Sequence, residues 1–143
     1  ESVQGTAILE SIILSCMMYI TGPLTYDMLQ DYRWCDDTNE KVEHVVEWLP
    51  LVHKYFTIDD SRKALLVIYC ESSGIETAVG KNTNGTQDVG LWQFNDDRWS
   101  WLKDKLNITS KRTNPKVSTA VASWLVYNDG WHHWNSSKHC WGR

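Results

Sequence analysis

Two acidic side chains, Glu71 and Asp88, lie in contrasting sequence surroundings that would give their carboxyl groups different chemistry. Glu71 ends an apolar stretch, where desolvation and the negative end of a helix dipole both oppose ionisation of its carboxylate. Asp88 follows a polar segment, residues 82–87, in which a carboxylate stays ionised. A protonated carboxyl can protonate the leaving oxygen while an ionised one stabilises or attacks the oxocarbenium-like centre. The plainer alternatives are a solvent-facing glutamate at a helix end and an aspartate that caps a turn.

The elements that must position these carboxylates are a helix and a hairpin. Residues 60–72 predict a core helix that is capped by Asp59 or Asp60 and ended by Gly74. Asn84-Gly85, between residues 79–83 and 86–92, predicts a short β-hairpin that carries Asp88.

Helical patterns dominate the rest of the chain. They predict helices at residues 7–20, at 38–49 with Pro50 as the stop, at 96–106, and from Asn114-Pro115 to 128–130. Residues 24–36 are ambiguous, and a short terminal helix carries Cys140. We therefore expect a mainly α (α+β) fold with a small β-hairpin that flanks a cleft. A single domain spans residues 1–143, with 1–55 as a helical N-terminal extension and 56–143 as the catalytic core.

Composition excludes several functional classes. The 143 residues suit one domain, and the net charge of −4 without a Lys/Arg cluster argues against nucleic-acid binding. The longest apolar run, residues 7–20, is about half a bilayer span and contains Glu10, so we expect no membrane span. Nine tryptophans are more than one small core usually holds, so some of them are expected to line a ligand groove.

Cysteines and glycosylation sequons indicate the compartment. Four widely spaced cysteines predict two disulfides, and of the three possible pairings we favour Cys16–Cys35 with Cys70–Cys140. Sequons begin at Asn84, Asn107 and Asn135. We therefore expect a secreted or lumenal protein (extracellular, lysosomal or vacuolar) in a mature or trimmed form that lacks a signal peptide.

Two groups of polar residues suggest metal binding only weakly. His132-His133 with His139 matches no zinc spacing, and the pairs Asp59-Asp60 and Asp96-Asp97 lack the alternating acidic loop of an EF-hand. Surface histidines and helix caps explain these residues, so no metal and no cofactor are expected.

The segment around both carboxylates resembles a known family. Glu71-Ser72-Ser73-Gly74, residues 82–95 (NTNGTQDVGLWQFN) and Arg98-Trp99 resemble the active-site segment of animal c-type lysozymes, with features of goose-type lysozymes and soluble lytic transglycosylases. Residues 114–134 resemble the final helix and aromatic turn of bacterial lysozyme-like domains. The resemblance to the lysozyme-like superfamily covers about residues 60–134, and it implies a lysozyme-like fold.

The resemblance also implies roles for individual residues. Glu71 is the expected general acid/base, and Asp88 is the nucleophile or electrostatic stabiliser. Gln93 and Asn95 are expected to contact the backbone and sugar amides beside the cleft. Trp99 is the expected sugar-stacking platform, and Tyr127 resembles the cleft tyrosine of transglycosylase-like domains. Core packing is the alternative for Trp99 and Tyr127, and Trp92 is expected in the core.

The resulting hypothesis is an antibacterial, monomeric muramidase-type lysozyme. It hydrolyses the β-1,4 bond of peptidoglycan between N-acetylmuramic acid and N-acetylglucosamine with retention. The first alternative is a lytic transglycosylase that uses Glu71 alone and releases a 1,6-anhydro product. A chitin-directed hydrolase is a second alternative, suggested by the acidic pI of about 5.7. A third is a non-catalytic lysozyme-like module that binds glycans or a protein partner.

Overall fold

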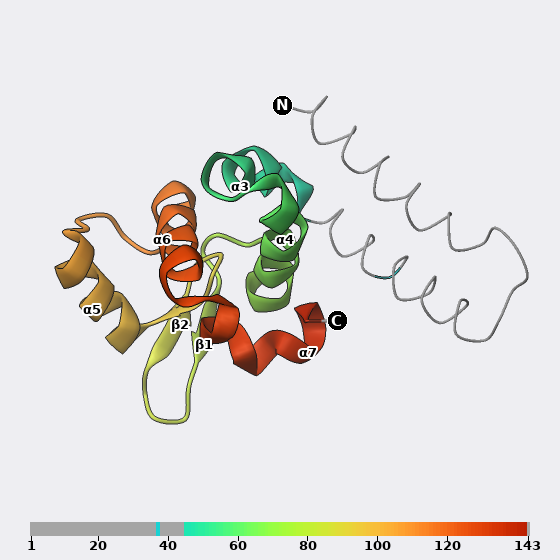
Figure 1. Ribbon diagram of the computed structural model, residues 1–143. Coiled ribbons are helices and arrows are strands. Elements are labelled where there is room, and N and C mark those ends of the chain that lie inside the picture. Colours follow the sequence, from blue (N-terminus) through green and yellow to red (C-terminus); the bar gives the residue numbers. More distant parts are fainter. Residues whose placement is uncertain (1–36, 38–44, 143) are drawn as a thin grey trace, which may run out of the picture.

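The computed structural model describes Asp37 and residues 45–142 (Figure 1). The predictions for residues 1–36 and 38–44, including the helix at 7–20 and the Cys16–Cys35 pairing, lie outside the described residues. No helix among the described residues is long and apolar enough to cross a membrane.

The predicted mainly helical fold with a small β-region is confirmed. In chain order the helices are η2 (Val46–Trp48), α3 (Leu49–Tyr55), α4 (Ile58–Ser72), α5 (Asp96–Leu106), α6 (Pro115–Asp129), η3 (Trp131–Ser137) and α7 (Lys138–Trp141). The strands β1 (Val79–Lys81), β2 (Gln87–Val89) and β3 (Phe94–Asn95) form an antiparallel sheet in the order β1-β2-β3.

Helix α4 is the core helix that the sequence predicts. Ala64, Leu65, Val67 and Ile68 are each at most 1% exposed, so the helix is apolar on nearly every side and lies inside the domain. Its start differs from the prediction, because the N-cap is Thr57 rather than Asp59 or Asp60.

Pro50 corrects a second helix boundary. It was expected to stop a helix over residues 38–49, but it lies in the first turn of α3 instead. The physical reason is that proline has no backbone N–H. In the first turn of a helix this group has no intrahelical partner, so proline is tolerated there and can begin a helix as well as end one.

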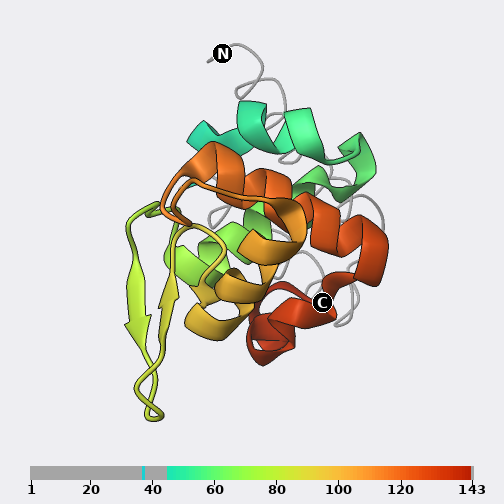
Figure 2. The same cartoon turned by 90° about the vertical axis from the view of Figure 1, so that its left-hand side faces the viewer.

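The hairpin between α4 and α5 has the predicted turn. Val79 pairs with Val89 and Lys81 with Gln87, and Gly85 adopts a φ of 88° in the connecting turn. A positive φ of this size suits glycine, which has no Cβ to clash. The hairpin projects away from the helices in both views (Figures 1 and 2). The third strand, β3, was not expected and joins β2 to the start of α5.

Helices α5 and α6 begin as the sequence predicts. Asn114 caps α6 by accepting a hydrogen bond from the Val117 N–H, with Pro115 as the first helical residue. Trp92, which is fully buried, packs between Phe56 and Trp134 with ring centroids 5.6 and 5.3 Å away. This aromatic core holds the hairpin base, α3 and η3 against one another.

Candidate active site

Glu71 lies in the last turn of α4 and is partly buried. The helix ends beside it because Ser73 adopts a left-handed conformation with φ of 54°. Burial raises the pKa of the Glu71 carboxyl most, hydrogen bonding from the Ser137 side chain opposes that rise, and the negative charge of Asp88 adds to it. The predicted environment of Glu71 is therefore present, and it favours a carboxyl that keeps its proton.

A disulfide bond holds the C-terminal segment over Glu71. Cys70 is bonded to Cys140, as predicted, and this bond ties the end of α4 to α7. The segment just before α7 is η3, whose last residue is Ser137, and the Ser137 side chain is one of the groups that influence the pKa of Glu71. The C-terminal segment therefore supplies a wall of the site that sequence reasoning did not identify, although the pairing of Cys70 with Cys140 already implied its position.

Asp88 lies at the centre of the small sheet. It faces Gly80 of β1 and Asn95 of β3 in the strand register. The Asn95 Nδ2 group donates a hydrogen bond of 2.9 Å to Asp88 Oδ1, and Asn95 Oδ1 accepts from the Asp97 N–H as the N-cap of α5. Asn95 therefore fixes the Asp88 carboxylate relative to α5 and satisfies one of its oxygens.

Both carboxyl groups border the same pocket, which has a volume of about 200 Å³. Its walls come from the end of α4, the sheet, the start of α5 and η3. The structure thus brings together the two residues that were expected to perform the chemistry. The lining residues are Glu71, Asp88, Trp92, Gln93, Phe94, Asn95, Arg98, His133, Trp134 and Ser136.

Gln93 and Asn95 lie at the pocket, where they were expected. Gln93 has a φ of 50°, and its Nε2 donates to the carbonyl oxygens of Ala78 and Gly90 at 3.0 and 2.9 Å. These bonds close the base of the hairpin. The expected contacts of Gln93 and Asn95 with a bound sugar stay a prediction.

Two tryptophans of α5, Trp99 and Trp101, differ sharply in exposure. Trp99 is only 6% exposed, packs on Phe94 with ring centroids 5.4 Å apart, and does not line the pocket. The expected sugar-stacking role of Trp99 therefore does not fit its core position. Trp101 is two positions further on, on the opposite face of the helix, and is 51% exposed. It borders a second hollow with Asn95, Asp97 and Arg98, so the two hollows share Asn95 and Arg98.

Tyr127 also lies apart from the two carboxyl groups. It is 49% exposed, and its hydroxyl donates a hydrogen bond of 2.8 Å to Asp60 and accepts one of 2.9 Å from the Thr57 N–H. Thr57 and Glu71 mark opposite ends of α4. Tyr127 therefore joins α6 to the start of α4, and the expected position of this tyrosine in the catalytic cleft is wrong.

A chain of polar contacts reaches the pocket from the end of α6. Arg98 Nη1 lies 2.6 Å from His133 Nδ1, and His133 Nε2 lies 2.9 Å from Asp129 Oδ2. A guanidinium only donates, so His133 Nδ1 accepts and its Nε2–H donates to Asp129. Burial lowers the pKa of His133, as do the charges of Arg98 and His132, while Asp129 opposes them. Sequence reasoning missed these contacts because Arg98 and His133 are 35 residues apart in the chain, although Asp129 and His133 are only 4 apart.

The three sequon asparagines are solvent-exposed. Asn84 lies in the turn of the hairpin, Asn107 ends α5, and Asn135 lies in η3. Exposure leaves each of them accessible, and their glycosylation stays a prediction.

Comparison with known proteins places the chain in a family. Searches of the curated proteins and of the solved structures found no significant match. A family model described as "Transglycosylase SLT domain" matches residues 57–131, more than half of the chain. The matched range contains both carboxyl groups and ends at the first residue of η3. The chain belongs to the transglycosylase SLT domain family, within the lysozyme-like superfamily.

Proposed function

We propose that this protein cleaves the β-1,4 glycosidic bonds of peptidoglycan by hydrolysis, between N-acetylmuramic acid and N-acetylglucosamine. The observation that carries the proposal is the shared pocket of Glu71 and Asp88, in which burial raises the pKa of Glu71. Family membership supports peptidoglycan as the substrate.

In the first chemical step Glu71 gives its proton to the glycosidic oxygen, and the bond from that oxygen to the anomeric carbon breaks. Positive charge develops on the sugar ring, where the Asp88 carboxylate stabilises it or forms a covalent bond to it. Glu71, now ionised, takes a proton from water as the water oxygen attacks the anomeric carbon, and where Asp88 has bonded to that carbon this bond breaks and Asp88 leaves as a carboxylate. This step restores the protonated Glu71 and releases the second product.

The two adjoining hollows provide a path for a glycan chain. The hollow beside Trp101 has a volume of about 540 Å³, larger than the pocket that holds the carboxyl groups. An exposed indole beside polar side chains is typical of carbohydrate sites, since sugar C–H faces pack on aromatic rings while hydroxyls form hydrogen bonds. In this proposal Trp101 takes the stacking role that the sequence comparison had suggested for Trp99.

The second candidate is a lytic transglycosylase, and the family match is the observation that favours it. In that reaction Glu71 alone acts as acid and then as base. The muramic C6 hydroxyl, instead of water, attacks the anomeric carbon, and a 1,6-anhydro sugar is released. Asp88 would then have no covalent role.

Mass spectrometry of digested peptidoglycan separates the two candidates, because the anhydro product is one water lighter than the hydrolysis product. Hydrated muropeptides are expected from the unmodified protein. Asp88→Asn is expected to lower the rate at least about 10²-fold, and Asp104→Asn, on the exposed part of α5, serves as the matched control. If Asp88→Asn released anhydro products at an unchanged rate, the hydrolysis proposal would be wrong and the protein would be a lytic transglycosylase.

Two further alternatives use the same site. A chitin-directed hydrolase would release chito-oligosaccharides from chitin and leave peptidoglycan intact. A non-catalytic glycan-binding module would bind chito-oligosaccharides without turnover. Binding of chito-oligosaccharides together with no cleavage of peptidoglycan or chitin would establish this alternative. The secreted or lumenal location belongs to the proposal too, and the Cys70–Cys140 disulfide supports it.

A further inference from the structure

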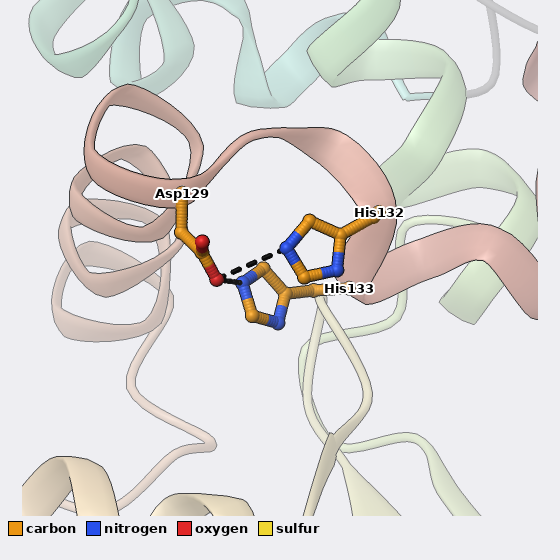
Figure 3. A group of neighbouring side chains, drawn as sticks. All are labelled: Asp129, His132 and His133. Carbon is orange, nitrogen blue, oxygen red and sulfur yellow. Dashed lines mark hydrogen bonds and ion pairs between the residues drawn. The ribbon is translucent and has the colours of Figure 1, made fainter.

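Three side chains meet where α6 ends, outside the pair of carboxyl groups used above. Asp129 is the last residue of α6, and Gly130, with φ of 90°, turns the chain into η3. This turn directs both imidazoles back toward Asp129 (Figure 3). His132 Nε2 lies 3.0 Å and His133 Nε2 lies 2.9 Å from the same oxygen, Asp129 Oδ2.

The spacing of these atoms fits a small metal ion. One ligand atom from each of the three residues lies within 4.8 Å of the other two. Tetrahedral ligands at about 2.0–2.1 Å from zinc are roughly 3.3 Å apart, so small side-chain rotations suffice. Two imidazole nitrogens with one carboxylate oxygen are also a donor set that Zn²⁺ and similar divalent transition metals prefer over Ca²⁺ or Mg²⁺.

We propose that Asp129, His132 and His133 form a binding site for one Zn²⁺-like cation, with water completing its coordination. The side chains of Asp129 and His132 are 60% and 55% exposed, so a cation can enter from solvent. The side chain of His133 is only 6% exposed, so packing holds one ligand in place. The sequence predicted no metal here and linked the two histidines only with His139, whereas the structure groups them with Asp129.

Binding of the cation also affects Arg98. In the structure His133 Nδ1 accepts from Arg98, so its proton is on Nε2, the atom that must coordinate the metal. Coordination moves the imidazole proton to Nδ1, which can then no longer accept from a guanidinium. Metal binding and the Arg98–His133 contact therefore exclude each other. Because Arg98 and His133 both line the catalytic pocket, an occupied site would alter that pocket's charge and shape.

Calorimetric titration of the untagged, disulfide-intact protein with zinc chloride tests the site. We expect one zinc per chain, and a loss of affinity of at least about tenfold in His132→Gln and in Asp129→Asn. His139→Gln, which changes an exposed histidine outside the cluster, is the matched control and should bind zinc normally. Thermal unfolding without zinc verifies that each variant is folded, and added zinc should raise the Tm of the unmodified protein and of the control only.

Arg98→Gln tests the competition separately. Removing the guanidinium frees His133 Nδ1 and deletes a nearby positive charge, so zinc should bind about tenfold more tightly. The proposal is overturned if the unmodified protein shows no saturable zinc binding, or if His132→Gln and Asp129→Asn bind as it does. Unchanged affinity in Arg98→Gln would overturn the exclusion between metal and arginine.

Discussion

The two sides of the candidate active site use the same functional group in opposite settings. Glu71 ends a buried helix, and a disulfide-anchored segment covers it. Asp88 lies in a three-residue strand of a hairpin that projects from the helices (Figure 2). Burial dominates the pKa of Glu71, whereas Asp88 receives a hydrogen bond from Asn95.

The difference shows how one fold can surround two carboxyl groups differently, since burial raises the pKa of Glu71 while a hydrogen bond from Asn95 holds Asp88. The chemical identity of the side chain matters less than the solvent and donors around it. The covered side should therefore depend on the packing of α4, η3 and α7. The exposed side should depend on hydrogen bonds and on the groups that hold the substrate.

The largest effect should come from removing the acid on the covered side. Glu71→Gln keeps the shape of the side chain but cannot donate a proton, so glycan cleavage should fall about 10³-fold or more. The measurement is the loss of turbidity of a suspension of bacterial cell walls.

Glu76→Gln provides the control, because Glu76 is an exposed glutamate in the loop that follows the same helix. It should retain full activity. Normal cleavage by a folded Glu71→Gln variant would refute the assignment of the acid.

Removing the disulfide between Cys70 and Cys140 should have the second-largest effect, because this bond anchors the segment that covers Glu71. The double variant Cys70→Ser/Cys140→Ser opens a loop of 70 residues, which should lower the free energy of unfolding by about 4 kcal/mol. It should also loosen η3 over Glu71, so that water enters and the pKa of Glu71 falls toward its ordinary value. Denaturant unfolding measures the first effect and the pH profile of cleavage measures the second. An unchanged pH profile in the folded double variant would mean that the disulfide does not keep Glu71 covered.

Local features of this site were predictable from the sequence, because short-range patterns determine them. The apolar run before Glu71, the Asn84-Gly85 turn before Asp88 and the Asn114-Pro115 helix start all hold in the structure. Each depends on neighbours within a few residues, where capping and turn preferences act.

Features that depend on tertiary packing were not predictable in the same way. Trp99 and Trp101 lie on opposite faces of α5, and the packing of Trp99 on Phe94 and the rest of the core buries one face and leaves the other exposed. Tyr127 bonds to Asp60, which is 67 residues away in the chain. The contact between Arg98 and His133 likewise requires the C-terminal segment to fold back over the pocket.

On the exposed side of the site, Trp101 should contribute to glycan binding. Trp101→Ala should raise the KM for glycan fragments about tenfold with little change in kcat, because the indole would stack on a sugar away from the reacting bond. Trp101→Phe keeps an aromatic face and should restore much of the binding. An unchanged KM in Trp101→Ala would mean that the substrate does not bind in the hollow beside Trp101.

The smallest effect should come from a single hydroxyl on the covered side. The Ser137 hydroxyl opposes the rise in the pKa of Glu71, because its hydrogen bond favours the ionised carboxylate. Ser137→Ala should therefore raise the pKa of Glu71 further. Since cleavage requires protonated Glu71, the alkaline limb of the pH–rate profile should move to higher pH, and the rate at a fixed pH should change by less than about tenfold. Ser136→Ala is the matched control, because Ser136 lines the pocket but does not influence the pKa of Glu71. A shift of the alkaline limb to lower pH in Ser137→Ala would contradict the assignment of that limb to Glu71.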